Sequence, residues 1–135
     1  MKKIIKIEEL QKCTCFNLRS MARELTNEYN CFLKSSGVSS TQIPILAILN
    51  IYNHLETTKI AELLNLEIST IRRNLLILKK KKLIKIVKRD INGNLMTLTK
   101  DGFSKLKEIL PIWRKSNNKG KKRLQDYLKI LKSIS

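Results

Sequence analysis

The sequence predicts one mainly α-helical domain that carries a single short β-hairpin. The chain has 135 residues, which is the size of one ordinary domain. It contains only four glycines and two prolines, the residues that most often interrupt helices. Apolar side chains recur at helical spacing along most of its length, and the β-branched run of residues 83–88 is the main exception.

The charge narrows the classes of partner. The chain has 28 Lys plus Arg against 11 Asp plus Glu, a net charge of +17. Such a charge favours a polyanion, either nucleic acid or an acidic membrane surface. No stretch of about 18 apolar residues could cross a membrane, and the basic N-terminus lacks the long apolar region of a secretory signal. Three cysteines, an odd number, do not make a disulfide framework, so we expect a cytoplasmic protein.

The first predicted helix is long and spans residues 8–35. Apolar residues follow one another every three or four positions from Leu10 to Phe32. Gly37, at the likely C′ position, ends the helix. A helix of this length with an apolar stripe needs a partner helix, and a second copy of the chain is one candidate.

A helix-turn-helix follows. One helix is predicted over residues 41–53, after a cluster of N-capping residues at 39–42. Thr57 is expected to cap a second short helix and Ser69 a third, with a turn at residues 65–67 between them. Two short helices joined by a turn of about three or four residues are typical of the helix-turn-helix motif.

A two-stranded wing comes next. Residues 83–88 are β-branched, residues 90–94 contain a hairpin-type Asn-Gly, and residues 95–98 supply the return strand. Thr99 then caps helical sequence that reaches Ile134, which Pro111 is expected to bend or restart. We expect one intertwined domain in three parts: an N-terminal helix for dimerisation (1–37), a winged helix-turn-helix (38–98) and C-terminal dimerisation helices (99–135).

Basic charge is concentrated in the second helix of the motif and the first wing strand. Residues 72–89 contain no acidic residue and nine basic ones: Arg72, Arg73, Lys79, Lys80, Lys81, Lys82, Lys85, Lys88 and Arg89. This coincidence predicts contact with DNA. A solvated surface is the alternative interpretation of the lysine run 79–82.

Helical phase assigns roles within this segment. If Ile71, Leu75 and Leu78 face the core, Ser69, Arg73, Leu76, Ile77 and Lys80 face outward. Arg73 is the candidate for a guanine contact, since a guanidinium can donate two hydrogen bonds to the base. Thr70 and Arg72 lie on the flanks of this face. With Ser69 they are candidates for phosphate contacts, although Ser69 could serve only as a cap and Arg72 only as a surface residue. Lys85, Lys88 and Arg89 would contact the DNA backbone or the minor groove.

No catalytic constellation is found. His54, the one histidine, lies at a predicted helix end and is interpreted as structural. No metal-protease, phosphate-loop or nucleophile-elbow motif occurs, and three cysteines at this spacing do not suit structural zinc. We therefore expect neither an enzyme nor a bound cofactor or metal.

At this point the sequence resembles winged helix-turn-helix regulators of the MarR (multiple antibiotic resistance regulator) family over nearly its whole length. The segments that carry the resemblance are Cys13–Arg19, Leu63–Leu66, Ser69–Leu75, Leu98–Gly102 and Leu110–Arg114. The resemblance implies a homodimer built from the N- and C-terminal helices. It also implies binding to a pseudo-palindromic operator, relieved by a small ligand or by cysteine oxidation.

The sequence departs from the family pattern at three places. Lys82 replaces the usual glycine after the recognition helix, so another capping geometry is expected there. The wing tip offers Asn92 and Asn94 where the family has Asp and Arg, so these two residues, with Lys88 and Arg89, are the weaker candidates for the minor-groove contact. Leu76 and Ile77 face outward where polar contacts are common, so base readout is expected to be sparse or to favour thymine methyl groups.

Two regulatory sites are candidates. Cys13, Cys15 and Cys31 are interpreted either as small hydrophobic residues at a dimer interface or as an oxidation sensor. On a helix, Cys13 and Cys15 would point about 200° apart. From the resemblance, Phe16, Arg19 and Trp113 could line a ligand pocket, with packing in the core or at an interface as the alternative for the two aromatic residues.

The leading hypothesis is a homodimeric, sequence-specific regulator of transcription on double-stranded DNA, acting as a repressor. The alternative is a module that binds a protein partner on the same fold, with weak and non-specific DNA binding. A basic amphipathic protein on acidic membranes is the weakest interpretation, because the basic residues concentrate on the helix-turn-helix.

Overall fold

The computed structural model describes residues 1–91 and 93–134. Its helices are α1 (Ile7–Gln11), α2 (Thr14–Leu33), a 3-10 turn (Lys34–Ser36), α3 (Ile43–Tyr52), α4 (Thr57–Leu64), α5 (Ile68–Lys80) and α6 (Lys100–Ile134). Its strands are β1 (His54–Glu56), β2 (Ile84–Lys88) and β3 (Leu95–Leu98). The predicted fold class, mainly helical with a winged helix-turn-helix, is confirmed.

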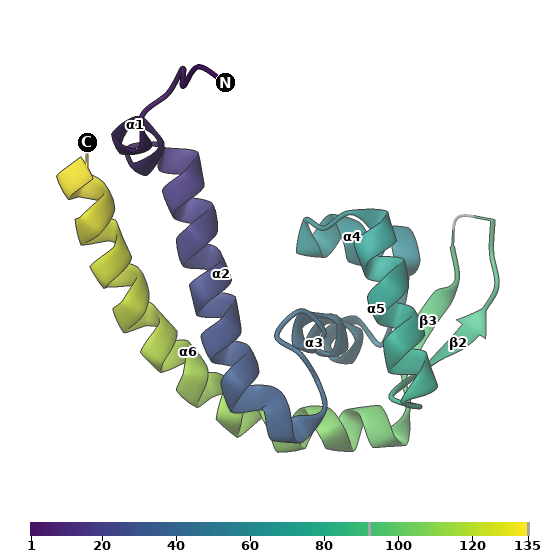
Figure 1. The fold of residues 1–135 in the computed structure, drawn as a ribbon. Coiled ribbons are helices and arrows are strands. Elements are labelled where there is room, and N and C mark those ends of the chain that lie inside the picture. The colour runs from purple at the N-terminus through teal and green to yellow at the C-terminus, as the bar shows by residue number, and fades with distance from the viewer. Residues whose placement is uncertain (92, 135) are drawn as a thin grey trace.

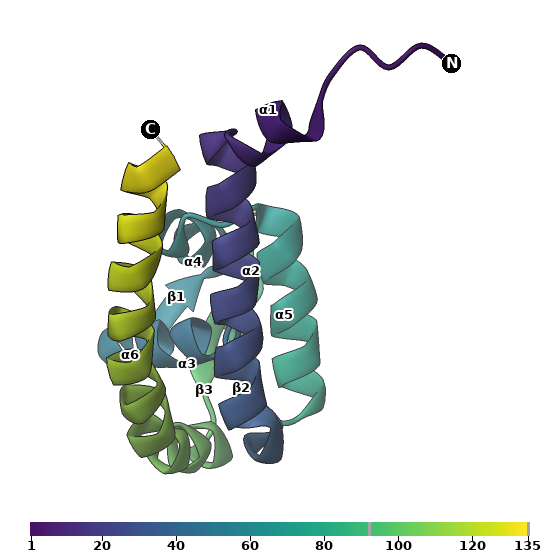
Figure 2. The ribbon, with the colours of Figure 1, turned by 60° about the vertical axis from the view of Figure 1, so that its left-hand side comes forward.

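The molecule has two parts (Figures 1 and 2). We call α2 and the portion of α6 that runs beside it the arm, and α3–α5 with the three strands the winged part. Helix α6 begins beneath the winged part and then turns upward along α2 (Figure 1). Pro111 lies within this single helix, so the chain bends without restarting.

The core lies in the winged part and is centred on α3, which is apolar on nearly all sides. The largest fully buried side chains are Leu33, Ile43, Ile45, Leu46, Leu49, Ile60, Ile71, Leu78, Ile84 and Ile109. They come from six different elements, so burial of α3 joins the end of α2, the helix-turn-helix, the sheet and the start of α6 into one unit.

The sheet has a third strand that the sequence analysis did not predict. The strand order is β1-β3-β2, all antiparallel, with His54 opposite Thr97 and Ile84 opposite Leu98. The ladder between β2 and β3 is irregular at Val87, which is exposed. His54 is exposed and begins β1, so it does not lie at the helix end that the sequence predicted.

The long N-terminal helix is interrupted where the sequence predicted continuity. Cys13 is extended (φ −70°, ψ 114°) and separates α1 from α2. The Asn17 side-chain amide donates to the carbonyls of Gln11 (2.7 Å) and Cys13 (3.0 Å), which stabilises the break. The predicted end is confirmed, because Gly37 is left-handed with φ 71°.

Two predicted caps are wrong. Glu56 and Glu67 occupy the N-cap positions of α4 and α5, so Thr57 and Ser69 lie inside those helices. The Thr57 hydroxyl donates instead to the Asn94 carbonyl of the wing at 3.2 Å. Tertiary contact with the wing therefore determines the role of Thr57, not local helix chemistry.

The start of α6 is fixed by a compact junction. The Thr99 hydroxyl accepts from the Gly102 N–H at 3.0 Å, which confirms the predicted cap. The Thr99 N–H donates to the Leu83 carbonyl at 3.0 Å. A Cβ on Gly102 would lie 1.9 Å from that same carbonyl oxygen. Only glycine allows α6 to begin this close to the strand that follows α5.

Candidate DNA-binding surface

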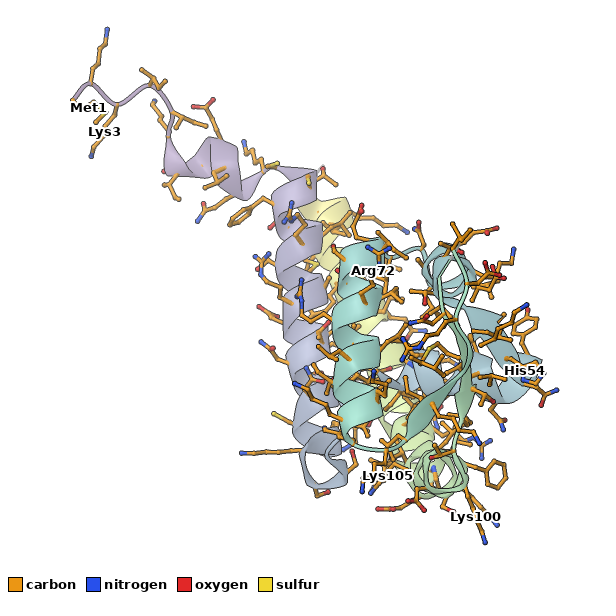
Figure 3. The ribbon with its side chains drawn as sticks, turned by 90° about the vertical axis from the view of Figure 1, so that its right-hand side faces the viewer. Met1, Lys3, His54, Arg72, Lys100 and Lys105 are labelled. Carbon is orange, nitrogen blue, oxygen red and sulfur yellow. The ribbon has the colours of Figure 1, made fainter. Side chains whose placement is uncertain are left out.

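Helix α5 presents the two faces that its sequence predicted. Ile71, Leu75 and Leu78 are buried. The outward residues Ser69, Arg73, Leu76, Ile77 and Lys80 are all exposed. Figure 3 shows α5 on the surface of the molecule, with Arg72 near its start and His54 well away on the sheet. Arg73 is thus free to meet a ligand that approaches this face.

The end of α5 corrects one expectation. Lys82 takes the left-handed conformation (φ 59°) that glycine usually supplies, so the capping geometry is the ordinary one. The Leu83 N–H donates to the Leu78 carbonyl at 3.0 Å, and the Lys82 N–H donates to the Lys79 carbonyl at 2.9 Å. This is the Schellman pattern, and burial of Leu78 and Leu83 supplies its apolar contact. The two hydrogen bonds and this contact offset a backbone cost of about 1 kcal/mol for a non-glycine residue.

The wing contacts the first residue of α4, just before β3 begins. The Asn94 carbonyl accepts from both the N–H and the hydroxyl of Thr57, each at 3.2 Å. A Cβ on Gly93 would lie 3.1 Å from the Thr57 Cβ, so the wing packs closely on the helix here. Asn94 is half-buried, whereas Lys85, Lys88 and Arg89 are exposed along the wing. The predicted contact Asn92 lies outside the described residues.

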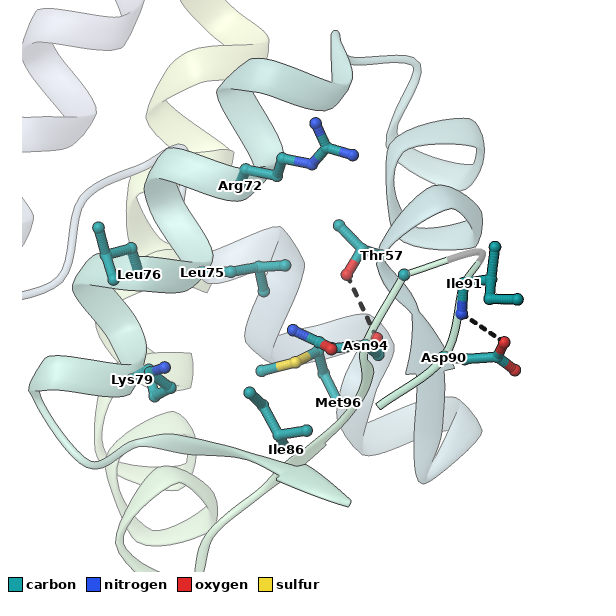
Figure 4. Close-up of a pocket in the computed structure, with 11 residues that line it drawn as sticks. Thr57, Arg72, Leu75, Leu76, Lys79, Ile86, Asp90, Ile91, Asn94 and Met96 are labelled. Carbon is teal, nitrogen blue, oxygen red and sulfur yellow. Dashed lines mark hydrogen bonds between the residues drawn. The ribbon is translucent and has the colours of Figure 1, made fainter. Parts of the chain in front are cut away.

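A groove of about 390 Å³ separates α5 from the wing (Figure 4). Arg72 and Lys79 border it from α5, and Asp90 and Ile91 border it from the wing. Arg72 therefore lies on a flank of α5, as its helical phase predicted, and the structure shows that this flank faces the wing. Lys79 was not singled out as a site residue, although its place seven positions after Arg72 puts both on one side of a helix.

The basic groups of this surface are not neutralised within the chain. Among the described residues, none of the nine basic side chains at positions 72–89 forms an ion pair with a carboxylate. Lys81 donates to the Gly37 carbonyl. Because the other cations of α5 and β2 point into solvent, their positive potential extends outward, where a polyanion would meet it.

The structure separates the three candidate residues of the ligand pocket within one protomer. Tyr29 donates to Asn117 at 3.3 Å and Tyr127 donates to Glu24 at 2.9 Å, so α2 and α6 are antiparallel. In this register Trp113 lies past Tyr29, toward the end of α2. Phe16 lies near the start of α2, 13 residues or about 20 Å from Tyr29. Arg19 is one turn from Phe16 and is exposed, so one chain does not bring the three residues together.

The cysteines are all exposed and unbonded. The helical argument about Cys13 and Cys15 is wrong, because Cys13 lies before α2 in an extended conformation. Cys15 and Cys31 are 16 residues apart on α2, or about 24 Å. Within the described ranges no group of three metal-ligating side chains gathers, and no helix there combines the length and the apolar character that a membrane span requires.

Polar contacts join the two helices of the arm. Arg123 and Glu28 form an ion pair at 2.6 Å, and a Cβ on Gly120 would lie 2.6 Å from the Tyr29 hydroxyl oxygen. Burial, followed by the hydrogen bond to Glu24, raises the pKa of Tyr127, and burial raises the pKa of Tyr29. Both phenols therefore stay neutral hydrogen-bond donors at physiological pH.

Comparison with known proteins places this geometry in a class. The chain matches no protein-family sequence model and no curated protein. Among solved structures, MosR of M. tuberculosis is similar with a TM-score of 0.74 and 25% identity over 90% of each chain. BpsR of Bordetella bronchiseptica is similar with a TM-score of 0.73 and 18% identity, and the match covers 93% of this chain and 96% of BpsR. A MarR variant of E. coli complexed with operator DNA is similar with a TM-score of 0.69 and 14% identity. That match covers 87% of this chain and 89% of the MarR chain.

The fold is that of a winged helix protein. More specifically, these neighbours are MarR-family transcriptional regulators, and the chain has their fold over most of its length. The resemblance found in the sequence is confirmed at this level.

Proposed function

We propose that the chain is a MarR-family regulator of transcription that binds double-stranded DNA in a sequence-specific manner. One observation carries the proposal: the outward face of α5 and the adjoining wing expose basic side chains that no carboxylate of the described residues neutralises. Two neighbours of the same fold, MosR and MarR, have been solved in complex with DNA.

The exposed residues of α5 suit the major groove. Arg73 points outward from the N-terminal half of the helix, the half that reaches base edges in this motif. Its guanidinium donates two hydrogen bonds to a guanine, worth about 1–3 kcal/mol of discrimination. Leu76 and Ile77, 49% and 36% exposed, suit thymine methyl groups. Ser69 and Thr70 in the first turn are placed to bind phosphate.

The groove beside α5 suits the DNA backbone. A recognition helix in the major groove and a wing at the adjacent minor groove straddle one sugar-phosphate strand. Arg72 and Lys79 border this gap, and both can bind phosphates there. Lys85, Lys88 and Arg89 extend the contact along the wing. These contacts carry affinity but no sequence information.

The end of the arm, where large apolar side chains are exposed, supports a homodimer. These side chains are Ile4, Ile5, Ile7, Leu10, Phe16, Leu18, Leu124 and Leu128. The start of α2 and the end of α6 lie near each other in Figures 1 and 2. A second copy that covers this end through a two-fold axis would present two α5 helices to successive major grooves about 34 Å apart, as a pseudo-palindromic operator requires.

In this proposal the protein is a cytoplasmic repressor, and an inducer releases it from DNA. Both routes implied by the resemblance stay open. The exposure of Cys13, Cys15 and Cys31 gives an oxidant access to each thiol. A small ligand would need a pocket completed by the second copy, because one protomer separates Phe16 and Arg19 from Trp113.

The test is a selection of bound fragments from the host genome, followed by titration of the enriched duplex and an unrelated duplex of equal length at matched salt. We expect one palindromic site bound at least about 10³-fold more tightly than the unrelated duplex. Equal affinity for both duplexes would contradict the proposal. That result, with a protein co-purifying on the exposed Leu76 and Ile77 surface, would favour the alternative of a partner-binding module.

A further inference from the structure

The buried side of α5 carries a polar residue, Asn74, which is only 9% exposed. Both the oxygen and the nitrogen of its side-chain amide have a hydrogen-bond partner. The Asn74 Oδ1 accepts from Gln42 Nε2 at 3.4 Å, and the Asn74 Nδ2 donates to the Thr70 carbonyl at 2.9 Å. A buried amide that lost its partners would cost about 1–3 kcal/mol, so this pairing fixes the place of α5 against Gln42.

Gln42 belongs to the turn between α2 and α3, residues 37–42, which we call the α2–α3 turn. It is 6% exposed. Its Oε1 accepts from the Ser39 N–H at 3.2 Å. The next N–H, that of Ser40, donates to Asn30 Oδ1 on α2 at 2.8 Å. Polar contacts therefore run from α2, through the turn, to the Thr70 carbonyl on the helix that faces DNA.

A second contact joins the same turn to the other end of α5. The Lys81 ammonium donates to the Gly37 carbonyl. Lys81 and Gln42 border one small groove of about 270 Å³ against the end of α2. Asn74 and Lys81 are seven residues apart, or about 10 Å along the helix. The buried face of α5 already packs on the core. Two polar contacts at this separation constrain the direction of its axis further than one contact would.

We propose that the α2–α3 turn sets the orientation of α5 through Asn74 and Lys81, and so couples the arm to DNA reading. Both act as positioning residues. Lys81 belongs to the basic segment of residues 72–89, but in this proposal its ammonium serves the Gly37 carbonyl and not DNA. A displacement of α2 relative to the winged part reaches α5 as a change in its direction. The inference rests on the proposed function, because it concerns how the recognition helix is held.

The two kinds of DNA contact respond differently to a change in the direction of α5. Hydrogen bonds to base edges require donor–acceptor distances of about 2.7–3.2 Å and good alignment. Phosphate contacts by lysine depend on charge and tolerate small shifts. Loss of the positioning contacts therefore lowers affinity for the operator while affinity for unrelated DNA stays nearly constant.

The experiment uses the full chain with two variants. The double variant Gln42→Met with Asn74→Leu replaces both amides by apolar groups of similar volume, so neither amide is left facing a lost partner. The Ser39 N–H also loses its acceptor, Gln42 Oε1, and the melting temperature reports the cost of that loss. Lys81→Met keeps the aliphatic stem of an exposed residue and removes its donor. The matched control is Ser116→Ala, which removes a buried hydroxyl of α6 that donates to the Ile112 carbonyl at 2.9 Å.

The readouts are the ratio of affinities for operator and unrelated duplex, the salt dependence of each, and the melting temperature. We expect the ratio to fall about tenfold in each variant, because this is the effect of losing one base contact. Affinity for unrelated DNA and the salt slope should stay as in the wild type. In the control the ratio should not change.

Three results would overturn the inference. The first is an unchanged ratio in a folded double variant or in Lys81→Met. The second is a salt slope reduced by about 0.9 in Lys81→Met with both affinities lowered, which would show that Lys81 binds a phosphate. The third is a wild-type protein without operator preference, which would contradict the proposed function itself and is recognised by that measurement alone.

Discussion

The winged part and the arm are stabilised in different ways. In the winged part, side chains from α3, α4, α5 and β2 are completely enclosed. In the arm, Leu33 at the very end is the buried residue of α2, and beyond Ile109 the buried residues of α6 are Ser116, Gly120 and Tyr127. Polar pairs and half-buried apolar side chains such as Met21 and Leu25 join these two helices, and other apolar side chains, such as Leu124 and Leu128, are exposed.

This difference shows which part can bury its apolar side chains within one chain. The winged part buries its apolar side chains and is expected to remain folded in a lone protomer. The arm leaves apolar surface exposed at its end, and that surface gains stability only when another surface covers it. In our proposal, recognition of DNA belongs to the winged part and assembly to the arm, and the two parts meet at the start of α6 and at the α2–α3 turn.

The largest expected contrast comes from one substitution made in each part. Leu46→Ala removes a fully enclosed side chain of α3 and should lower the free energy of unfolding by about 2–5 kcal/mol. Leu128 is 48% exposed on α6. Leu128→Ala should change the free energy of unfolding of a lone protomer by less than about 0.5 kcal/mol but weaken dimerisation.

Urea denaturation at low protein concentration and sedimentation across a concentration series measure the two effects. Equal loss of unfolding free energy in both variants would show that Leu128 is as well packed in a lone protomer as Leu46. An unchanged dimer constant in Leu128→Ala would remove this residue from the interface.

DNA binding provides the second contrast. Arg73→Ala should reduce discrimination at one base pair by about 1–3 kcal/mol. Lys85→Ala should weaken binding to all duplexes similarly and reduce the salt slope by about one. Lys121→Ala, an exposed cation of the arm, is the control and should change neither. Salt-matched fluorescence titrations measure the affinity and its salt dependence in each variant. A reduced salt slope in Lys121→Ala would show that the arm contacts DNA.

The smallest expected effect has opposite signs in the two parts. Lys82→Gly relieves a left-handed lysine at the end of α5 and should raise the free energy of unfolding by about 1 kcal/mol. Lys122→Gly places glycine at an exposed position inside α6 and should lower helix stability by about 1 kcal/mol. Thermal unfolding of the two variants measures both, and destabilisation by Lys82→Gly would contradict the left-handed conformation.

Much of the site was accessible from the sequence because it depends on local pattern. The spacing of Ile71, Leu75 and Leu78 determines the buried face of α5, so the outward place of Arg73 and the flanking place of Arg72 could be predicted. Lys79 followed from the same periodicity but was assigned only to a lysine run. By contrast, the predicted association of Trp113 with Phe16 required the register between α2 and α6, which no local pattern specifies.

What the sequence alone determined are the helices, the hairpin, the cap at Thr99 and the basic segment of residues 72–89, because each depends on residues close in the chain. Tertiary structure decided the strand at His54–Glu56, the role of Thr57 and the burial of Asn74. A three-residue strand exists only beside a partner strand, and a buried amide is stable only where a distant residue completes its hydrogen bonds. Both conditions arise from contacts between segments far apart in the chain.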